Sequence, residues 1–484
     1  MMSLTNSEPF GVTDLRLVFP KEKDLFFKDL TFQYHQGEKI LFLGPSGCGK
    51  STLLQVLSGL IPNSIEIPIK TRESRIPKRC GIIFQDPETQ FCMPYADEEI
   101  AFVLENQQVA QDDMEDMIDQ YLTAVGLKLH HRHQLISTLS GGMKQRLAVA
   151  SVLALKPDIL FLDEPTALLD PKGTEDLWKT VQTVSKDKTL IIVEHKIDHV
   201  IDYVDRIVLF NFNGQIIADG PKEMIFNQYR SELRQYGIWY PGIWEETFPD
   251  GEILKLPQEF LTEPCLILKD FKAYRGKQVK FEVSQFQINK GEWVAIVGEN
   301  GAGKSTFIEG IMDLIKTKGD RVWKVKNEKN DVSFVFQNPE YQFVTDSVEE
   351  EMAFGLVIRG VKEEEIQLKV NEALRLFNLD HVRHLHPFQL SIGQKRRLSV
   401  ASSIIHKPSI ILLDEPTFGQ DARNTFSLLR QFERMREEGT TLIMVTHEEE
   451  IVHRFATREI MIHNGQIKSD ERTKRVVQLE GVNT

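Results

Sequence analysis

Two segments of the sequence have the residue types and spacing of a phosphate-binding loop. GPSGCGKST spans residues 44–52 and GENGAGKST spans residues 298–306, and each follows a short apolar run. Glycines in such a loop let backbone N–H groups point at phosphate oxygens, and the following helix contributes its positive end. We expect the lysines to neutralise the β and γ phosphates of a nucleotide and the serines to bind Mg²⁺. The predicted binding residues are Gly44, Ser46, Gly47, Gly49, Lys50, Ser51 and Thr52 in the first loop, and Gly298, Asn300, Gly301, Gly303, Lys304, Ser305 and Thr306 in the second.

An acidic pair follows an apolar run in each half of the chain, in the segments LFLDEP and ILLDEP. A strand that ends there would place its carboxylates at the carboxyl edge of a parallel sheet, where α/β proteins bind ligands. We expect Asp163 and Asp414 to hold Mg²⁺ through water, and Glu164 and Glu415 to polarise an attacking water. The alternative is a polar strand end without a chemical role, and the nearby phosphate-binding loops argue against it.

A second pair of segments, LSGGMKQ and LSIGQKR, places a serine before a glycine at the start of a basic helical stretch. This arrangement offers an anion a hydroxyl, a backbone N–H and a helix N-terminus. We interpret it as a further phosphate-binding element, formed by Ser140 and Gly142 in the first half and by Ser391 and Gly393 in the second.

These blocks belong to an internal repeat. The phosphate-binding loop recurs from residue 44 at residue 298, FQDPETQF recurs as FQNPEYQF, and VEH, which ends at His195, recurs as VTH, which ends at His447. Five blocks recur in one order at a nearly constant separation, which indicates a duplication.

The elements that must position these residues are short buried strands. KILFL, DILFL and TLIIV in the first half, and WVAIV, SIILL and TLIMV in the second, are typical of strands buried on both faces of a parallel sheet. The sequence therefore predicts an α/β fold in two domains, 1–235 and 264–484, joined by a linker over 236–263. The aromatic side chains of that linker (Trp239, Tyr240 and Trp244) are interpreted as a packed connector, with a regulatory or partner contact as the alternative.

Composition limits the class of protein. The 484 residues carry a net charge of −13, which argues against a protein whose main role is to bind nucleic acid. Four dispersed cysteines indicate a reducing compartment. We expect no secretion signal at the start and no run of 18 or more apolar residues, so a membrane role would require a partner. The cluster His130, His131 and His133 is interpreted as a surface turn, because its spacing is poor for a metal site.

The blocks together resemble the ATP-binding cassette (ABC) ATPases. LSGGMKQ and LSIGQKR resemble the signature of that family, and the other blocks resemble its Walker A, Q-loop, Walker B, D-loop and switch-histidine motifs. The resemblance covers nearly the whole chain twice. It implies two P-loop ATPase domains, each with a mainly parallel core sheet and a helical subdomain, that bind and hydrolyse MgATP as a pseudo-dimer within one chain.

In such a pseudo-dimer each ATP lies between the phosphate-binding loop of one half and the signature of the other. The resemblance implies that the glutamines of the Q-loops also reach Mg²⁺, and that Asp170 and Asp421 are the D-loop aspartates, while Phe19 and Tyr274 stack on adenine. One site would use Lys50, Ser51, Gln85, Asp163, Glu164 and His195 with Ser391 and Gly393; the other would use Lys304, Ser305, Gln337, Asp414, Glu415 and His447 with Ser140 and Gly142.

The two signatures depart from the family pattern LSGGQ. Ile392 replaces a glycine in the second half, and a β-branched residue adopts positive φ only at a cost. We therefore expect the site that contains Lys50 to be competent but slower. Met143 replaces the signature glutamine in the first half, which we expect to be a mild change.

The Q-loop regions narrow the resemblance further. QDPETQFCMPYADEEIAFVLEN and QNPEYQFVTDSVEEEMAFGL are similar to the Q-loop regions of energy-coupling-factor and cobalt-type importers. That resemblance implies a transmembrane coupling subunit, a substrate-binding membrane subunit and a peripheral place on the cytoplasmic face of the cell membrane. Among these importers, a chain with two fused ATPase domains resembles the ATPases that serve uptake of thiamine or its hydroxymethylpyrimidine precursor. Cobalt, nickel, riboflavin and other vitamins are alternatives, and a solvated acidic helix face is the alternative to a docking surface.

A soluble twin-cassette ATPase that acts on ribosomes or DNA is the competing class. Such proteins are expected to carry a long charged helical linker or zinc-binding insertions, and this sequence has neither. An ATP-binding scaffold without turnover is disfavoured because Glu164, Glu415, His195 and His447 are all present.

Overall fold

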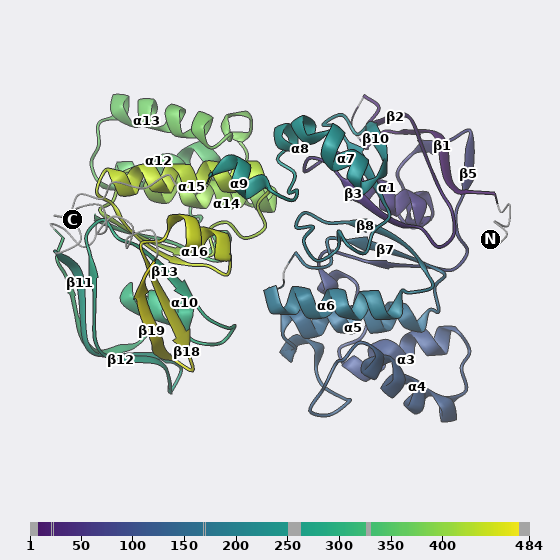
Figure 1. The fold of residues 1–484 in the computed structure, drawn as a ribbon, viewed down its shortest axis with the longest axis horizontal. Helices are drawn as coiled ribbons and strands as arrows, with labels where there is room; N and C mark the ends of the chain where they lie inside the picture. The colour runs from purple at the N-terminus through teal and green to yellow at the C-terminus, as the bar shows by residue number, and fades with distance from the viewer. Residues whose placement is uncertain are drawn as a thin grey trace. The chain divides into compact units, whose positions relative to one another are not determined.

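The structure is a computed structural model that describes residues 8–20, 22, 24–167, 169, 171–249, 263–325 and 331–473. Its residues form two compact units, 1–243 with 421–423, and 244–420 with 424–484 (Figure 1). The two units repeat one architecture, so each is described by itself.

The core of the first unit is a six-stranded sheet in the order β10-β9-β3-β8-β7-β6. All neighbouring strands pair in parallel except β9 and β10. The central strands are buried along their whole length because helices cover both faces of a parallel sheet. The bounds are β3 (Lys39–Leu43), β6 (Cys80–Ile83), β7 (Ile159–Asp163), β8 (Thr189–Val193), β9 (Arg206–Phe210) and β10 (Ile216–Pro221).

An antiparallel sheet and a helical subdomain complete the first unit. The antiparallel sheet contains β1 (Phe10–Leu17), β2 (Phe27–Tyr34), β4 (Ile69–Lys70) and β5 (Glu73–Arg75). The helices α3, α4 and α5 contact one another, and α6 lies beside α5 (Figure 1). The helix bounds are α1 (Lys50–Leu57), α2 (Leu60–Asn63), α3 (Ala96–Asn106), α4 (Gln111–Ala124), α5 (Gly141–Ala154), α6 (Pro171–Val184), α7 (Lys222–Gln228) and α8 (Arg230–Tyr236).

The second unit repeats this plan. Its six-stranded sheet has the order β15-β16-β17-β13-β18-β19, and a three-stranded antiparallel sheet has the order β12-β11-β14. The strands are β11 (Pro264–Arg275), β12 (Gln278–Asn289), β13 (Trp293–Val297), β14 (Thr317–Trp323), β15 (Val332–Val335), β16 (Ile410–Asp414), β17 (Thr441–Val445), β18 (Arg458–His463) and β19 (Gln466–Arg472). The helices are α9 (Ile243–Thr247), α10 (Lys304–Ile311), α12 (Val348–Ile358), α13 (Glu363–Leu376), α14 (Ile392–Ile404), α15 (Ala422–Glu437) and α16 (Glu449–Phe455).

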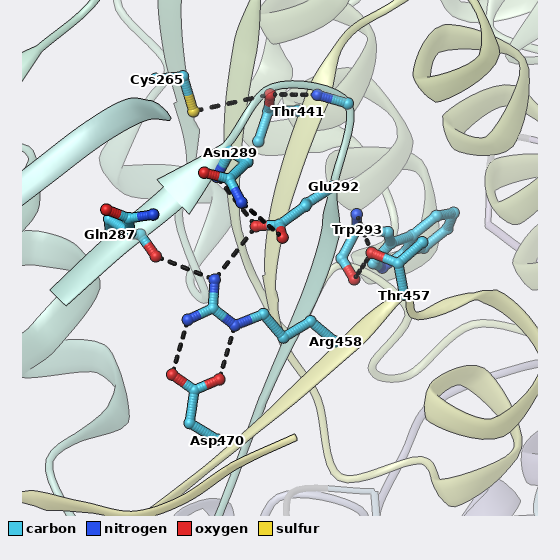
Figure 2. A network of polar contacts seen from close by, with 10 residues as sticks. Cys265, Gln287, Asn289, Glu292, Trp293, Thr441, Thr457, Arg458 and Asp470 are labelled. Atoms are coloured by element: carbon cyan, nitrogen blue, oxygen red, sulfur yellow. Dashed lines mark hydrogen bonds and ion pairs between the residues drawn. The ribbon is translucent and has the colours of Figure 1, made fainter. Parts of the chain in front are cut away.

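A polar network joins the two sheets of the second unit beside the start of β13 (Figure 2). The guanidinium of Arg458 donates to both carboxylate oxygens of Asp470 at 2.6 Å, to the carbonyl of Gln287 at 2.9 Å and to Glu292 at 3.2 Å. The first unit contains the same network, in which Arg206 contacts Asp219, Glu38 and the carbonyl oxygen of Gln33. The repeat therefore preserves a partly buried charge network as well as the chemical motifs.

The part of the predicted linker that the structure describes ends at residue 249. Trp239 and Tyr240 are buried, and the ring of Trp244 packs edge-on against Phe426, with 4.8 Å between the ring centroids. In the same region Arg454 donates to the carbonyl oxygen of Phe248 at 2.6 Å. These contacts favour the packed connector over the alternative. The proposed boundaries at residues 235 and 264 stay predictions, and residues 250–262 lie outside the described part.

Candidate nucleotide-binding sites

The phosphate-binding loop of the first unit joins β3 to α1, as predicted. Gly49 has a φ of 100°, and a Cβ at this position would lie 2.4 Å from the ring of Phe26. Only glycine fits these two conditions. The buried ammonium of Lys50 donates to the carbonyl oxygens of Gly44 at 2.8 Å and Pro45 at 3.0 Å. The loop thus gathers a cation and a helix N-terminus at one point, which suits a phosphate chain.

The loop between β13 and α10 repeats this geometry in the second unit. Gly303 has a φ of 108°, and a Cβ there would lie 2.7 Å from the carbonyl oxygen of Lys280. Lys304 donates to the carbonyl oxygens of Gly298 at 2.8 Å and Glu299 at 3.0 Å. The two loops therefore have equivalent conformations.

The acidic pair of the first unit lies at the carboxyl end of β7, beside the phosphate-binding loop. The hydroxyl of Ser51 donates to Asp163 at 2.8 Å. Glu164 has a φ of 47°, and its carboxylate receives a hydrogen bond from Nε2 of Gln85 at 2.9 Å and lies 2.9 Å from Nε2 of His195. Four segments distant in sequence thus meet at one edge of the sheet, in the grouping that the family resemblance implied.

The second unit assembles the equivalent residues. Ser305 hydrogen-bonds Asp414, and Nε2 of His447 lies 3.0 Å from the Glu415 carboxylate. Gln337 is 3.5 Å from Glu415, the longer of the two glutamine–glutamate contacts. Both units therefore place a histidine against the proposed catalytic carboxylate, and they differ in how closely the glutamine approaches it.

Burial and local charge separate the two carboxylates of each pair. Burial raises the pKa of Asp163 and of Asp414 to about 6. Burial also opposes ionisation of Glu164, but its hydrogen bond to His195 and the charges of His195 and Lys50 leave the pKa of Glu164 below its ordinary value. The pKa of Glu415 is lowered in the same way against the effect of burial. Glu164 and Glu415 are thus ionised and able to accept a proton, whereas at each aspartate the effect of burial outweighs the charge of the loop lysine.

The donor set beside each loop fits Mg²⁺. A serine hydroxyl and a buried carboxylate are hard oxygen ligands, and Mg²⁺ in nucleotide sites is held by one or two such groups together with phosphate oxygens. Oδ1 of Asp414 is buried and has no hydrogen-bond partner within the described ranges. Those ranges contain no cluster of three or more histidine, cysteine, aspartate or glutamate side chains able to hold a metal. The phosphates of the nucleotide would therefore complete the coordination.

The two signature serines begin the helices α5 and α14. The hydroxyl of Ser391 accepts from the N–H of Gln394 at 3.3 Å, and the Gln394 side chain accepts from the N–H of Ser391 at 2.9 Å, which is a complete capping box. Ser140 accepts from the N–H of Met143 at 3.4 Å, and methionine cannot complete the exchange. Gly142 and Gly393 lie in the first turns of these helices. The pairing of each signature with the opposite phosphate-binding loop stays a prediction.

The expectation of backbone strain at Ile392 is wrong. Ile392 is the first residue of α14, Gly141 is the first residue of α5, and neither has a positive φ. The side chain of Ile392 is exposed. A helical residue of either type fits at this position, so strain gives no reason for the site that contains Lys50 to be slower.

The D-loop role of Asp421 and the adenine-stacking roles of the two aromatic residues all stay predictions. Phe19 packs edge-on against Phe26, with 5.0 Å between the ring centroids, and Phe26 borders Gly49 of the phosphate-binding loop. The ammonium of Lys316 lies 5.6 Å from the ring centroid of Tyr274. Stacking of Phe19 and Tyr274 on adenine stays a prediction. Asp170 lies outside the described residues.

Sequence reasoning missed a second carboxylate near each switch histidine, which is buried in the first unit and half-buried in the second. Glu194 accepts hydrogen bonds from the hydroxyl of Thr166 and from the N–H of His195, the latter at 3.0 Å, and burial raises the pKa of Glu194 to about 7. In the second unit Glu448 occupies this role, because Thr417 donates to it at 3.1 Å. The sequence signal that could have revealed this carboxylate is the glutamate of VEH, which is a threonine in VTH.

The described part of the chain has no helix that is both long enough and apolar enough to cross a bilayer. A family model described as ABC transporter matches residues 27–167 and 281–418. Each match begins at or within the second strand of an antiparallel sheet and ends just beyond an acidic pair. The two units are thus matched separately by one model.

Two relatives align with nearly the whole chain. A Bacillus subtilis (strain 168) protein named "Putative HMP/thiamine import ATP-binding protein YkoD" is 34% identical over 505 residues, covering 96% of this chain and 91% of that protein. A Methanosarcina acetivorans protein named "Putative ABC transporter ATP-binding protein" is 32% identical over 523 residues, covering 95% and 85% respectively.

A solved complex of an archaeal ribosomal stalk protein with the archaeal ribosome recycling factor aABCE1 contains a chain of the same fold. Its TM-score is 0.65 at 19% identity, and the match covers 94% of this chain and 90% of that chain. At this identity the likeness concerns the fold alone. The predicted fold of two α/β domains, each with a phosphate-binding loop, a mainly parallel sheet and helices, is confirmed.

Proposed function

Because this chain belongs to the ABC transporter family, whose members hydrolyse ATP, we propose that it is the ATPase subunit of an energy-coupling-factor-type importer. The observation that carries the catalytic part of the proposal is the repeated contact of a histidine and a glutamine with an ionised glutamate beside a phosphate-binding loop. Both units contain the complete set, so both are proposed to hydrolyse ATP.

The proposed mechanism assigns one role to each group. Lys50 and Lys304 neutralise the β and γ phosphates, and Ser51 with Asp163 and Ser305 with Asp414 hold Mg²⁺. When bound, the ion neutralises charge that develops on the phosphate oxygens. Glu164 and Glu415 accept a proton from the attacking water, and His195 and His447 fix the orientation of these carboxylates.

Gln85 and Gln337 are proposed to link this chemistry to a partner. Each glutamine contacts the catalytic carboxylate of its own unit and begins the segment that leads to α3 or α12. Movement of that segment would therefore alter the position of the carboxylate. From the family resemblance we infer that each ATP also contacts the signature of the opposite half, with Ser391 and Gly393 serving the first loop and Ser140 and Gly142 the second.

The surface that follows each glutamine supports a membrane partner. In the second unit the side chains of Tyr341, Val344 and Ile358 are exposed. The first turn of α12 adds the half-buried Glu349 and the exposed Glu350, whereas Glu351 is buried. An apolar surface beside acidic side chains fits a basic amphipathic helix of a transmembrane coupling subunit. We propose that the chain is peripheral to the cytoplasmic face of the membrane and that a separate membrane subunit binds the transported compound.

The substrate we propose is thiamine or its hydroxymethylpyrimidine precursor. The support is the name of the Bacillus subtilis relative, which aligns with 96% of this chain at 34% identity. Another vitamin or a metal ion would use the same ATPase chemistry, because a different subunit recognises the substrate.

Affinity purification from native membranes tests the importer proposal. We expect a small integral-membrane subunit and a substrate-binding subunit to co-purify with this chain, and thiamine or its precursor to bind the recovered complex. ATPase activity of the complex should fall in Glu164→Gln and in Glu415→Gln. Recovery of ribosomes or DNA without a membrane subunit would overturn the proposal in favour of a soluble twin-cassette ATPase.

A further inference from the structure

One position in the signature helices differs in charge between the two units. Gln145 in α5 and Arg396 in α14 occupy the same place in the repeat, and their side chains are 1% and 4% exposed. Each donates to the carbonyl oxygen of the residue before the Q-loop glutamine: Nε2 of Gln145 to Phe84 at 3.4 Å, and Nη1 of Arg396 to Phe336 at 2.9 Å. The hydrogen bond to the carbonyl oxygen is thus shorter in the second unit, and its donor there is a buried cation.

The buried guanidinium is costly as a purely structural element. Nε of Arg396 has no hydrogen-bond partner within the described ranges, and an unsatisfied buried donor reduces stability. Burial lowers the pKa of Arg396 to about 10, while the charges of Glu415 and Asp414 act in the opposite direction. A neutral glutamine makes the same contact in the first unit, so holding the carbonyl does not by itself require a cation.

The contact between the Q-loop glutamine and the catalytic carboxylate is instead shorter in the first unit than in the second. Gln85 lies 2.9 Å from Glu164, whereas Gln337 lies 3.5 Å from Glu415, at the outer limit of a hydrogen bond. Hydrogen bonds to an ionised group are about twice as strong as neutral ones, so releasing Gln85 from Glu164 costs more than releasing Gln337 from Glu415. Arg396 adds a positive charge near Glu415, whereas the equivalent residue of the first unit, Gln145, is neutral.

We propose that Arg396 is a positioning residue that holds the Phe336–Gln337 segment and compensates the charge of the Asp414–Glu415 pair, so that Gln337 is free to reach MgATP. The Lys304 site then binds MgATP at a lower concentration than the Lys50 site. The inference rests on ATP binding alone, so it stands or falls independently of the importer proposal.

A reciprocal exchange of the two residues tests the proposal. Lys50→Ala leaves binding at the Lys304 site, and Lys304→Ala leaves binding at the Lys50 site, so each dissociation constant for the Mg²⁺ complex of a non-hydrolysable ATP analogue is measured separately. In the Lys50→Ala background we expect Arg396→Gln to raise the dissociation constant about tenfold, the loss expected for a hydrogen bond from a charged group. In the Lys304→Ala background Gln145→Arg should lower it severalfold. Equal constants at the two sites, or no change in either exchange, would overturn the proposal.

Hydrogen exchange without nucleotide separates positioning from folding. Arg396→Gln should increase amide exchange in the peptide 334–343 and leave the matched peptide 82–91 unchanged. Arg396→Lys, which keeps the charge and a donor, should restore most of the affinity lost in Arg396→Gln. If Arg396→Lys binds the analogue as weakly as Arg396→Gln, or if Arg396→Gln increases exchange throughout the second unit, the role is structural and the proposal fails.

Discussion

Nε2 of His195 lies 2.9 Å from the carboxylate of Glu164, in a unit where the same glutamate also receives a hydrogen bond from Gln85. The carboxylate is thus held from two sides. Three segments that end or follow neighbouring strands supply these groups, because parallel strands bring their carboxyl ends to one edge of the sheet.

Replacement of the proposed catalytic glutamates should abolish turnover while nucleotide binding persists. For Glu164→Gln and for Glu415→Gln we expect the hydrolysis rate of the affected site to fall about 10²- to 10⁴-fold, since a glutamine cannot accept the proton of the attacking water. Binding of MgATP is measured in parallel by equilibrium dialysis. Glu115→Gln, which alters an exposed carboxylate of α4 paired with Arg132, is the control and should retain activity. A variant at either catalytic position that kept its full rate would exclude the assigned role.

Much of this constellation was predictable from the sequence. Lys50, Asp163 and their counterparts follow short apolar runs, and a parallel sheet has few ways to arrange such runs. The loop glycines were equally predictable. At Gly49 the positive φ and the nearby ring of Phe26 leave no room for a side chain, which is the reason the motif requires glycine there.

Other features depend on contacts that no local pattern specifies. Thr166 is paired with Glu194, but in the second unit the equivalent threonine pairs with Glu448, which comes from a different position in the repeat. Which glutamate pairs with each threonine can be seen only from the three-dimensional positions of the side chains. The error at Ile392 arose because the motif was assigned a glycine-specific conformation, whereas the residue simply begins a helix.

Glu194 should make the stability of the protein depend on pH. Burial raises the pKa of Glu194 from its ordinary value of 4.5 to about 7, so the native state binds its proton more tightly than the unfolded chain does. This stabilisation is fully present below pH 4.5 and is lost as the pH rises to about 7. Glutamine does not titrate, so the free energy of unfolding of Glu194→Gln should not show this decrease. Between pH 4.5 and pH 8 the free energy of unfolding of the wild type should therefore fall by on the order of 2 to 3 kcal/mol more than that of Glu194→Gln. Urea unfolding at both pH values measures the difference.

The comparison needs a carboxylate that is exposed. Glu223→Gln on α7 serves as the control, since Glu223 lies at the surface. The same pH trend in Glu223→Gln and Glu194→Gln would show that Glu194 is not the group responsible.

The polar network around Arg458 should contribute strongly to the stability of the second unit (Figure 2). Arg458→Met removes the partner of Glu292, whose side chain is only 5% exposed. Loss of one member of a buried ion pair destabilises by about 3 to 5 kcal/mol, because the other charge stays buried. Lys369→Ala removes an exposed helical ion pair with Glu365 and should change stability by about 0.5 kcal/mol or less. The double variant Arg458→Met, Glu292→Gln should be more stable than Arg458→Met alone, and a less stable double variant would contradict this account.

The incomplete capping box at Ser140 offers a reciprocal test of helix capping within one chain. Met143→Gln supplies the side-chain oxygen that Gln394 provides in the second unit, where it accepts from the N–H of Ser391 at 2.9 Å. We expect Met143→Gln to stabilise the first unit by about 0.5 to 1 kcal/mol and Gln394→Met to destabilise the second by a similar amount, because each change adds or removes one satisfied helix-end donor. Both are measured by urea unfolding, with Met143→Leu as the control that changes shape without adding an acceptor. A gain in Met143→Leu equal to that in Met143→Gln would assign the effect to helix propensity, since capping requires the amide oxygen.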